Sequence, residues 1–245
     1  MSEGRVALIT GGARGLGRAI GLALAGDGWR VALCYRTSAA GASSAVAAIQ
    51  AAGAQAMSVR ADVSRPEAAE RLVHEVEASY GRIDALFNCA GPYRRVPLLE
   101  ETVDGWHEMF DNNLHPVFYL SRLVAPGMQA RGWGRIVNFS MVNADQLVGQ
   151  PNLTAHYIAK AGVLVLTRSL ARVLAPHGVT VNAISPGFID SGSMPEDELA
   201  HMARTIPAGY AGSPDDVVGI ARFLVSDAAR YVNGANIQVS GAWGV

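Results

Sequence analysis

The sequence predicts a single α/β domain, residues 1–245, built on a doubly wound parallel sheet. Short β-branched runs alternate with longer segments whose apolar residues are spaced by three and four, an order typical of strands joined by crossover helices. Most of the strand-like runs lack polar alternation, as strands buried on both faces do. A chain of 245 residues without a repeat, linker or low-complexity tract also suits one large domain.

Seven strands are expected, at residues 6–10, 30–35, 55–60, 85–89, 135–139, 180–184 and 236–239. Six helices are expected, at residues 16–25, 42–52, 66–80, 106–130, 155–174 and 214–226. Ser64 and Ser213 are good helix caps, because a proline and acidic residues follow each of them in the first turn. One long irregular stretch remains, residues 188–212, which a compact domain would use as a substrate loop or lid. Its acidic run, 193–198, is a candidate start of a lid helix.

The composition argues against several classes of function. Half of the residues are hydrophobic, 17% are charged and the net charge is −1, so no global charge favours binding to nucleic acid or a membrane. No apolar run approaches the roughly 20 residues of a membrane span. The strand expected from residue 6 leaves no room for a signal peptide. We therefore expect a cytoplasmic protein that acts on a small molecule.

The cysteines and histidines show no metal-binding pattern. Cys34 and Cys89 lie in apolar segments and are expected to be small buried side chains rather than a disulfide. Five histidines are scattered without the spacing of metal ligands: His74, His107, His115, His177 and His201. No metal site is expected.

A glycine-rich turn links the first strand to the first helix. Gly11, Gly15 and Gly17 stand in this turn, and Leu16 opens the helix. Glycine allows a tight turn and a close approach of the backbone to a ligand. The start of the helix offers free N–H groups to an anion. In this strand–turn–helix context, the glycines favour a dinucleotide-binding loop over a turn without a ligand.

The residues after the second strand indicate which dinucleotide is bound. A carboxylate there binds the ribose hydroxyls of NAD, whereas an arginine accommodates the 2′-phosphate of NADP. This segment contains Arg36 and Thr37 and no acid, and Arg14 adds a second cation in the glycine loop. Two guanidinium groups near one phosphate favour NADP(H) over NAD(H). The alternative is that both arginines are solvated surface charges.

The spacing of the glycine loop, Thr-Gly-x-x-x-Gly-x-Gly, resembles that of the short-chain dehydrogenase/reductase family, and the resemblance continues along almost the whole chain. Asp62-Val63 is similar to the pair that the family uses near adenine. Residues 88–91, Asn-Cys-Ala-Gly, are similar to its Asn-x-Ala-Gly segment. Residues 106–114 resemble its Trp-(six residues)-Asn-Leu run, which implies that Asn113 is the family's catalytic asparagine.

Residues 135–139 resemble the family's fifth strand, and residues 181–191 resemble the segment that lies against the nicotinamide. The resemblance implies a Rossmann-like fold and a homo-oligomer, a tetramer or a dimer built on the faces of the fourth and fifth helices and the C-terminal strand. Together with the residues themselves, it gives these cofactor-binding candidates: Gly11, Arg14, Gly15, Leu16, Gly17, Arg36, Thr37, Asp62, Val63, Asn88, Ala90, Gly91, Lys160, Pro186, Gly187 and Ile189.

The catalytic segment departs from the family pattern of serine, tyrosine and lysine. Lys160 matches the family lysine, but the residue four positions before it is His156 instead of a tyrosine. Tyr157 lies only three positions before it. At about 100° per residue, the two side chains lie roughly 40° and 60° on either side of Lys160, so both can face it. The candidate catalytic residues are therefore Tyr157, Lys160, Asn113 and His156.

The family serine is also missing. Counting from Asn138 places it at Met141, whereas counting back from Lys160 places it at Asn143, because the segment carries about two extra residues. Ser140 and Asn143 are the nearest groups able to hydrogen-bond a carbonyl. Asp145 joins them if the loop folds inward.

Three interpretations remain open. In the first, His156 or Tyr157 replaces the usual acid in a working NADP(H)-dependent reductase. In the second, a π-type irregularity moves Tyr157 into the usual place. In the third, the protein binds NADP(H) but catalyses little and serves as a regulator or scaffold. The favoured reaction is reduction of a ketone or 3-oxoacyl carbonyl. Arg94 and Arg95 are candidate contacts for an anionic substrate, or solvated charges at the rim of the site.

Overall fold

The computed structural model describes residues 4–190 and 196–244. In this part of the chain, seven parallel strands form one sheet in the order β3-β2-β1-β4-β5-β6-β7, so the predicted doubly wound parallel sheet is confirmed. The strands are β1 (Val6–Thr10), β2 (Arg30–Tyr35), β3 (Ala56–Arg60), β4 (Ala85–Asn88), β5 (Gly134–Phe139), β6 (Val179–Pro186) and β7 (Asn236–Val239). The strand order reverses between β1 and β4, and ligands of open α/β sheets bind beyond the carboxyl ends of the strands at such a switch point.

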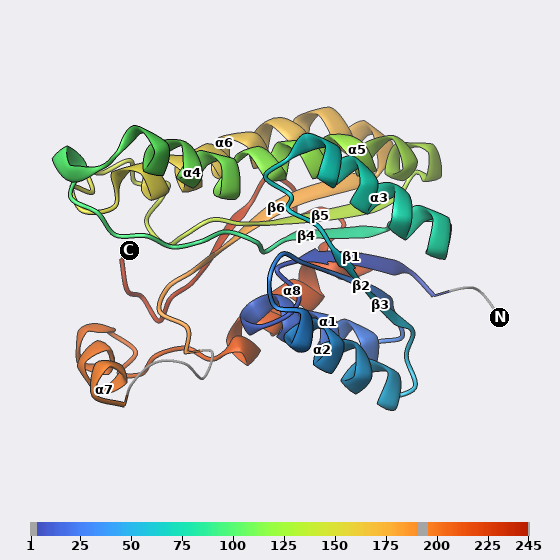
Figure 1. Cartoon of the computed structure of the whole chain (residues 1–245), viewed down its shortest axis with the longest axis horizontal. Helices are drawn as coiled ribbons and strands as arrows, with labels where there is room; N and C mark the ends of the chain where they lie inside the picture. The colour runs from blue at the N-terminus through green and yellow to red at the C-terminus, as the bar shows by residue number, and fades with distance from the viewer. Residues whose placement is uncertain (1–3, 191–195, 245) are drawn as a thin grey trace.

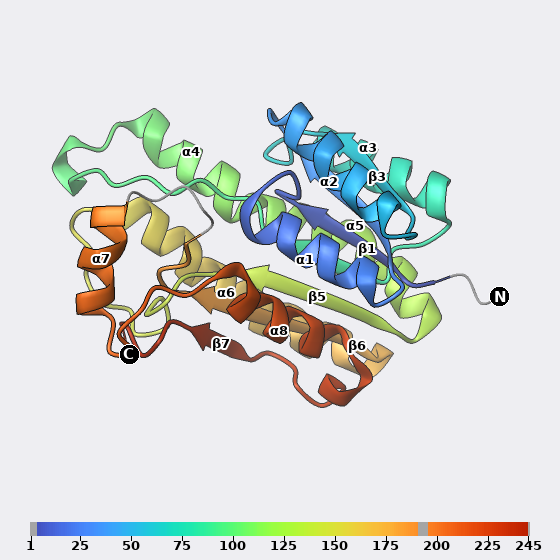
Figure 2. The same ribbon diagram turned by 90° about the horizontal axis from the view of Figure 1, so that it is seen from below.

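Helices cover both faces of the sheet (Figure 1). On one face lie α1 (Gly15–Gly26), α2 (Ala39–Ala51) and α8 (Pro214–Val225). On the other lie α3 (Pro66–Tyr80), α4 (Val103–Asn113), α5 (His115–Arg131) and α6 (Thr154–Leu174). A further helix, α7 (Glu196–Thr205), lies beyond the end toward which β5 and β7 point in Figure 2. Three short 3₁₀ helices, η1 (Leu98–Glu100), η2 (Ala175–His177) and η3 (Asp227–Ala229), complete the described elements.

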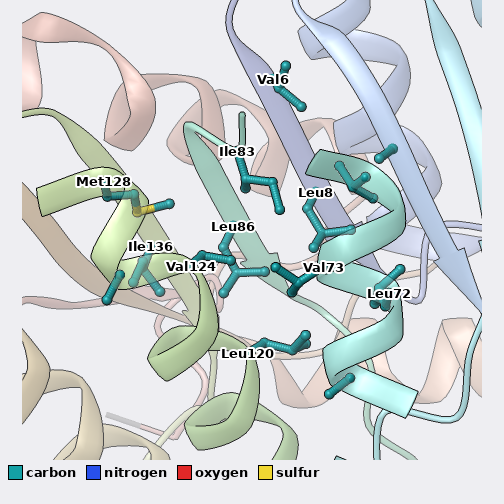
Figure 3. Packing of buried hydrophobic residues seen from close by; sticks show 14 of the residues in the cluster. Val6, Leu8, Leu72, Val73, Ile83, Leu86, Leu120, Val124, Met128 and Ile136 are labelled. Carbon is teal, nitrogen blue, oxygen red and sulfur yellow. The ribbon is translucent and has the colours of Figure 1, made fainter. Parts of the chain in front are cut away.

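The core is two apolar layers separated by the sheet. Alternate residues of a strand face opposite sides, so in β1 Val6 and Leu8 join one layer while Ala7 and Ile9 join the other. Figure 3 shows the first layer, in which side chains of α3 and α5 pack against Leu8 and other residues of the sheet. Strands buried on both faces explain the continuous apolar runs in the sequence.

One predicted helix is wrong. The apolar spacing predicts a single helix over residues 106–130, but the chain forms α4 and α5, separated at Leu114. Pro116 stands in the first turn of α5, where the missing N–H is tolerated. The interruption leaves Asn113 as the last residue of α4. The other predicted helices and strands are confirmed to within three residues at each end.

The stretch 188–212 leaves the sheet and returns to it. The backbone N–H of Asp190 donates to the carbonyl of Gly212 at 2.8 Å, and the N–H of Gly212 donates to Phe188 at 2.9 Å. This stretch is not wholly irregular, because it contains α7. Residues 193–195 of the candidate lid-helix start lie outside the described residues.

None of the helices described in residues 4–190 and 196–244 has both the length and the apolar character that crossing a membrane requires.

Candidate active site

A groove of about 380 Å³ lies at the carboxyl ends of β1 to β4, beside the switch point. Four turns line it together with Asn112: Gly11 and residues 13–17 after β1, residues 34–38 after β2, residues 61–63 after β3 and residues 89–92 after β4. The lining includes these predicted cofactor-binding residues: Gly11, Arg14, Gly15, Leu16, Gly17, Arg36, Thr37, Asp62, Val63, Ala90 and Gly91. The remaining candidates, Asn88, Lys160, Pro186, Gly187 and Ile189, do not line it.

The glycine loop forms the floor of the groove. A β-carbon on Gly17 would lie 2.6 Å from the carbonyl oxygen of Gly11, so no side chain fits there. Gly11 and Gly15 have φ values of +67° and +54°, which L side chains rarely adopt. The backbone is therefore open to a ligand at the start of α1, where free N–H groups favour an anion.

Two charged side chains stand at the outer end of the groove. Arg36 donates to Oδ1 of Asn112 at 2.9 Å and lies 4.0 Å from the carboxylate of Asp62. Asp62 accepts hydrogen bonds from the backbone N–H and the hydroxyl of Ser64, at 3.2 and 2.7 Å. The side chain of Arg36 is half exposed, and a guanidinium has five N–H donors. Arg36 therefore keeps donors for a ligand anion.

Asn88 anchors the sheet behind the groove. Its Nδ2 donates to Oδ1 of Asn138 at 2.8 Å, and Asn138 donates in turn to the hydroxyl of Thr167 at 2.9 Å. These buried groups tie β4 and β5 to α6. Oδ1 of Asn88 is buried without a hydrogen-bond partner among the described residues.

Gly91 joins the groove to the predicted catalytic residues. A β-carbon on Gly91 would lie 2.5 Å from Oδ1 of Asn113 and 3.3 Å from Nζ of Lys160. Nδ2 of Asn113 donates to the carbonyls of Met109 and Pro92, at 3.0 and 3.2 Å, so its oxygen faces Gly91. The groove therefore continues into a buried polar cluster, which the break between α4 and α5 helps to build.

Lys160 is a buried cation. Its Nζ donates to the carbonyl of Phe139 at 2.9 Å, and the residue is 7% exposed. Burial lowers its pKa to about 8, against a smaller opposite effect of Cys89. Lys160 is also the only lysine in a sequence that has 20 lysine and arginine residues. Its being the one lysine of the sequence singles out Lys160 independently of the family motifs.

His156 lies beside Lys160 in α6. It is 5% exposed, its Nδ1 has no hydrogen-bond partner in the described part of the chain, and its ring meets that of Tyr93 edge to face at 5.3 Å. Burial and the charge of Lys160 lower its pKa from the ordinary 6.5 to about 4, although the carbonyl of Pro92 opposes them. The imidazole is therefore neutral near pH 7.

The low pKa of His156 makes stability depend on pH. Between about pH 6.5 and 4, the unfolded chain takes up a proton on this histidine and the folded chain does not. The free energy of unfolding should therefore fall as the pH falls through this window, by roughly 2–3 kcal/mol from this group. Urea unfolding of the wild type and a His156→Gln variant at pH 7 and 4.5 checks this. An equal loss in both proteins would contradict it.

Tyr157 points to a different part of the structure. Its hydroxyl donates to the carbonyl of Asn143 at 2.7 Å and accepts the N–H of Val148 at 3.2 Å. Its ring packs in a small apolar cluster with Ala144, Leu164 and Ala183. α6 is α-helical from Thr154 onward, so the π-type irregularity considered from the sequence is not present. Of the two candidates, His156 interacts with the carbonyl of Pro92, which also accepts a hydrogen bond from Asn113. Tyr157 instead hydrogen-bonds the backbone of Asn143 and Val148.

None of the side chains near the expected serine position has a free hydroxyl. Ser140 donates its hydroxyl to the carbonyl of Lys160 at 2.8 Å. Asn143 adopts φ +59°, and its buried Oδ1 has no partner among the described residues. Asp145 turns away to β7, where its carboxylate accepts from Asn236 and Gln238 at 3.2 and 3.3 Å. Asn143 is therefore the polar side chain of this loop that remains available.

The other candidates lie around this cluster. Arg94 forms an ion pair with Glu101, so its charge is already balanced, while Arg95 is exposed. Val142 donates its N–H to the carbonyl of Pro186 at 3.2 Å, and Gly187 packs so closely on Ser240 that a β-carbon would lie 2.8 Å from it. Ile189 pairs with Gly212 at the base of the stretch 188–212. In residues 4–190 and 196–244, no three His, Cys, Asp or Glu side chains are grouped as metal ligands.

Comparison with known proteins identifies the family. The family model described as enoyl-(acyl carrier protein) reductase matches residues 11–243. The 3-oxoacyl-[acyl-carrier-protein] reductase of Synechocystis sp. is 37% identical over 238 residues, which are 97% of this chain and 96% of that protein. The enzyme of the same name from Staphylococcus aureus is 37% identical over 244 residues, 98% of each chain.

Solved structures agree with these relatives. A blue fluorescent protein from a metagenomic library, in complex with NADPH, has a TM-score of 0.92 and 32% identity, with 99% of each chain covered. A double mutant of a Serratia marcescens short-chain dehydrogenase/reductase has a TM-score of 0.93 and 29% identity, again with 99% of each chain covered. The glycine loop and the last three residues of the Asn-Cys-Ala-Gly segment, Cys89, Ala90 and Gly91, line one groove in the fold. This chain belongs to the short-chain dehydrogenase/reductase family of oxidoreductases.

Proposed function

We propose that the protein is an NADP(H)-dependent oxidoreductase that reduces a carbonyl of ketone or 3-oxoacyl type. One observation carries this proposal: Gly91 lines the groove and also lies against Asn113 and Lys160. A dinucleotide in the groove would thus end beside a buried polar cluster. The names of the 37% identical relatives support the substrate type, and the NADPH-bound structure supports the cofactor.

The residues of the groove fit NADP(H). Gly11 and Gly17 leave a cradle that a β-carbon would fill, and it suits a diphosphate. Arg14 and Arg36 would hold the 2′-phosphate, and Asp62 with Val63 would lie near adenine. Lys160 would hold the ribose beside the nicotinamide. When bound, the cofactor supplies the hydride that reduces the carbonyl carbon.

The proton for the new hydroxyl comes from this chain. His156 is neutral near pH 7, so it is a hydrogen-bond donor to the substrate oxygen rather than a strong acid. The ammonium of Lys160, with a pKa of about 8, can release a proton close to neutrality. We propose that the imidazole, one helical turn from Lys160, relays this proton to the substrate oxygen by accepting at one nitrogen while it donates from the other. Solvent then reprotonates Lys160.

Cofactor choice should depend on Arg36. We expect Arg36→Ser to weaken NADPH binding about tenfold or more, because a charged hydrogen bond to phosphate is worth roughly 1.5–3 kcal/mol. NADH has no 2′-phosphate, so its affinity should change less than about twofold. Fluorescence titration with both cofactors measures this, and Arg172→Ser, at an exposed arginine of α6, is the matched control. Equal losses for NADPH and NADH would contradict the assignment.

Residues 188–212 are proposed as the substrate lid, because their ends are joined at the sheet by the pairing of Phe188 and Asp190 with Gly212.

We infer in addition that the chain forms a homodimer or homotetramer. Phe118 on α5 and Val165 and Val173 on α6 are large apolar side chains exposed on the same covering layer, and a second copy of the chain would cover them.

A second function, an NADP(H)-binding regulator with little catalysis, is favoured by one observation. The family's serine and tyrosine positions lack hydroxyls, and the nearest hydroxyls, those of Ser140 and Tyr157, are both hydrogen-bonded to the backbone. Absorbance at the NADPH band, followed across a panel of ketones, 3-oxoacyl thioesters, quinones, pterins and imines, tests both functions. Turnover of a ketone or thioester supports the reductase. Tight NADPH binding without turnover of any compound supports the regulator.

A further inference from the structure

A second hollow, of about 560 Å³, opens at the edge of the sheet opposite the groove. Its lining comes from the amino ends of β5 and β6 and from the segment before β7. The hollow therefore lies at the amino ends of these strands, whereas the cofactor groove lies at the carboxyl ends. The polar side chains in its lining are Arg135, Thr180, Asp227, Arg230, Tyr231 and Asn233, with Trp133 beside them. The hollow is thus separate from the cofactor groove and from Lys160.

Arg135 is a buried guanidinium with unused donors. Its side chain is 3% exposed. Nη1 donates to the carbonyl of Gly134 at 2.9 Å and to that of Gly178 at 3.4 Å. Nε is buried without a partner, and the nearest acidic oxygen to Nη2, on Asp227, is 4.0 Å away, beyond hydrogen-bond distance. Buried donors are normally satisfied, and Nε with Nη2 is the pair that can bind two oxygens of one anion side by side.

The surroundings of Arg135 are positively charged. The guanidiniums of Arg5 and Arg135 both lie over the ring of Trp133, 4.0 and 4.4 Å from its centre. Asp227 is the one acid that lines the hollow, and Arg230 adds a third cation. In the described structure, the hollow and its border thus hold three guanidiniums, of Arg5, Arg135 and Arg230, and the carboxylate of Asp227.

Asp227 satisfies these donors poorly. Its Oδ1 is 3.4 Å from Nε1 of Trp133, 3.5 Å from Arg5 and 4.0 Å from Arg135. Three donors thus converge on one carboxylate oxygen, and each distance is at or beyond the limit of a hydrogen bond. The side chain of Asp227 is also 72% exposed, so it holds this place loosely. An anion with more oxygens would use the donors that Asp227 leaves free.

We propose that this hollow binds a small oxyanion, a phosphate or a carboxylate, through Arg135 and Arg230. The site does not depend on the proposed oxidoreductase function, since no residue of it belongs to the groove. The charge of Asp227 opposes binding, and removing that charge should therefore strengthen it.

Titration of the unfolding midpoint with inorganic phosphate, with chloride used to keep ionic strength constant, tests the site. The midpoint should rise by about a few degrees and saturate. Arg230→Gln should weaken the apparent affinity at least about fivefold, and Asp227→Asn should strengthen it by a similar factor. Arg222→Gln, at an exposed arginine of α8 that pairs with Asp27, is the matched control and should leave it unchanged. Acetate in the same titration decides between the two oxyanions, and a saturable response to either supports the proposal.

The cofactor groove is the competing phosphate site, so Arg36→Gln is tested as well. A response that Arg36→Gln removes and Arg230→Gln retains would assign the phosphate to the groove and overturn the proposal. A rise that does not saturate, or that chloride alone reproduces, would also overturn it. The indole N–H resonance of Trp133, assigned with a Trp133→Phe variant, gives a local readout and should shift along the same curve as the midpoint.

Discussion

Lys160→Met should lower NADPH-dependent kcat/KM at least about a thousandfold. The substitution removes both the proposed ribose contact and the proposed proton source, and loss of a single charged stabilising group alone costs about 10²–10³ in rate. Methionine has a similar length and is apolar, so the side chain still fills its place beside Phe139. Stopped-flow measurement of NADPH oxidation with the preferred substrate, together with a fluorescence titration of NADPH, measures the two losses separately.

The same variant should be more stable than the wild type. Lys160 is charged near pH 7 although burial lowers its pKa to about 8, so the folded state holds a buried cation at a cost. Methionine removes that cost, and we expect the free energy of unfolding to rise by about 1 kcal/mol or more. An active protein with normal NADPH affinity would contradict the placement of Lys160. An inactive protein that is also unfolded by urea more easily would contradict the account of its burial.

The second large effect should separate His156 from Tyr157. His156→Phe should lower kcat about 10²–10³-fold, because the ring that we propose to hydrogen-bond the substrate oxygen loses both nitrogens. Tyr157→Phe should leave kcat within about threefold of the wild type. It should instead lower the free energy of unfolding by about 1–2 kcal/mol, since the carbonyl of Asn143 and the N–H of Val148 lose their partner.

These two variants are matched controls for each other, because each replaces a buried ring with phenylalanine in the same turn of α6. Single-turnover kinetics and urea unfolding are measured on both. The reverse pattern, with Tyr157→Phe inactive and His156→Phe active, would assign the acid to Tyr157. Full activity in both variants would show that the substrate needs no proton donor from this turn.

The distribution of apolar residues along the sequence predicted most of the sheet, because strands that are buried on both faces are continuous apolar runs. It missed the break between α4 and α5, since Pro116 at the start of a helix does not interrupt the apolar spacing. The glycine loop and Arg36 line one groove because each follows directly from the end of a strand, whereas their binding of a cofactor stays a prediction.

The choice between His156 and Tyr157 lies beyond what helical geometry can decide. Angles of roughly 40° and 60° allow either side chain to face Lys160. The difference arises from the loop 143–148, whose backbone carbonyl and N–H engage the tyrosine hydroxyl. In that loop, Asn143 and Leu147 have φ values of +59° and +55°. No local pattern in the sequence predicts this left-handed backbone conformation.

The single lysine also gives this protein an internal reporter. Every other basic side chain except histidine is a guanidinium, and guanidiniums do not react with reagents that are selective for primary amines. Reductive methylation with ¹³C-formaldehyde would therefore label the ε-amine of Lys160 and the chain terminus alone. Two carbon signals, followed against pH and cofactor, would record the protonation of the methylated Lys160 amine in a protein of unchanged sequence.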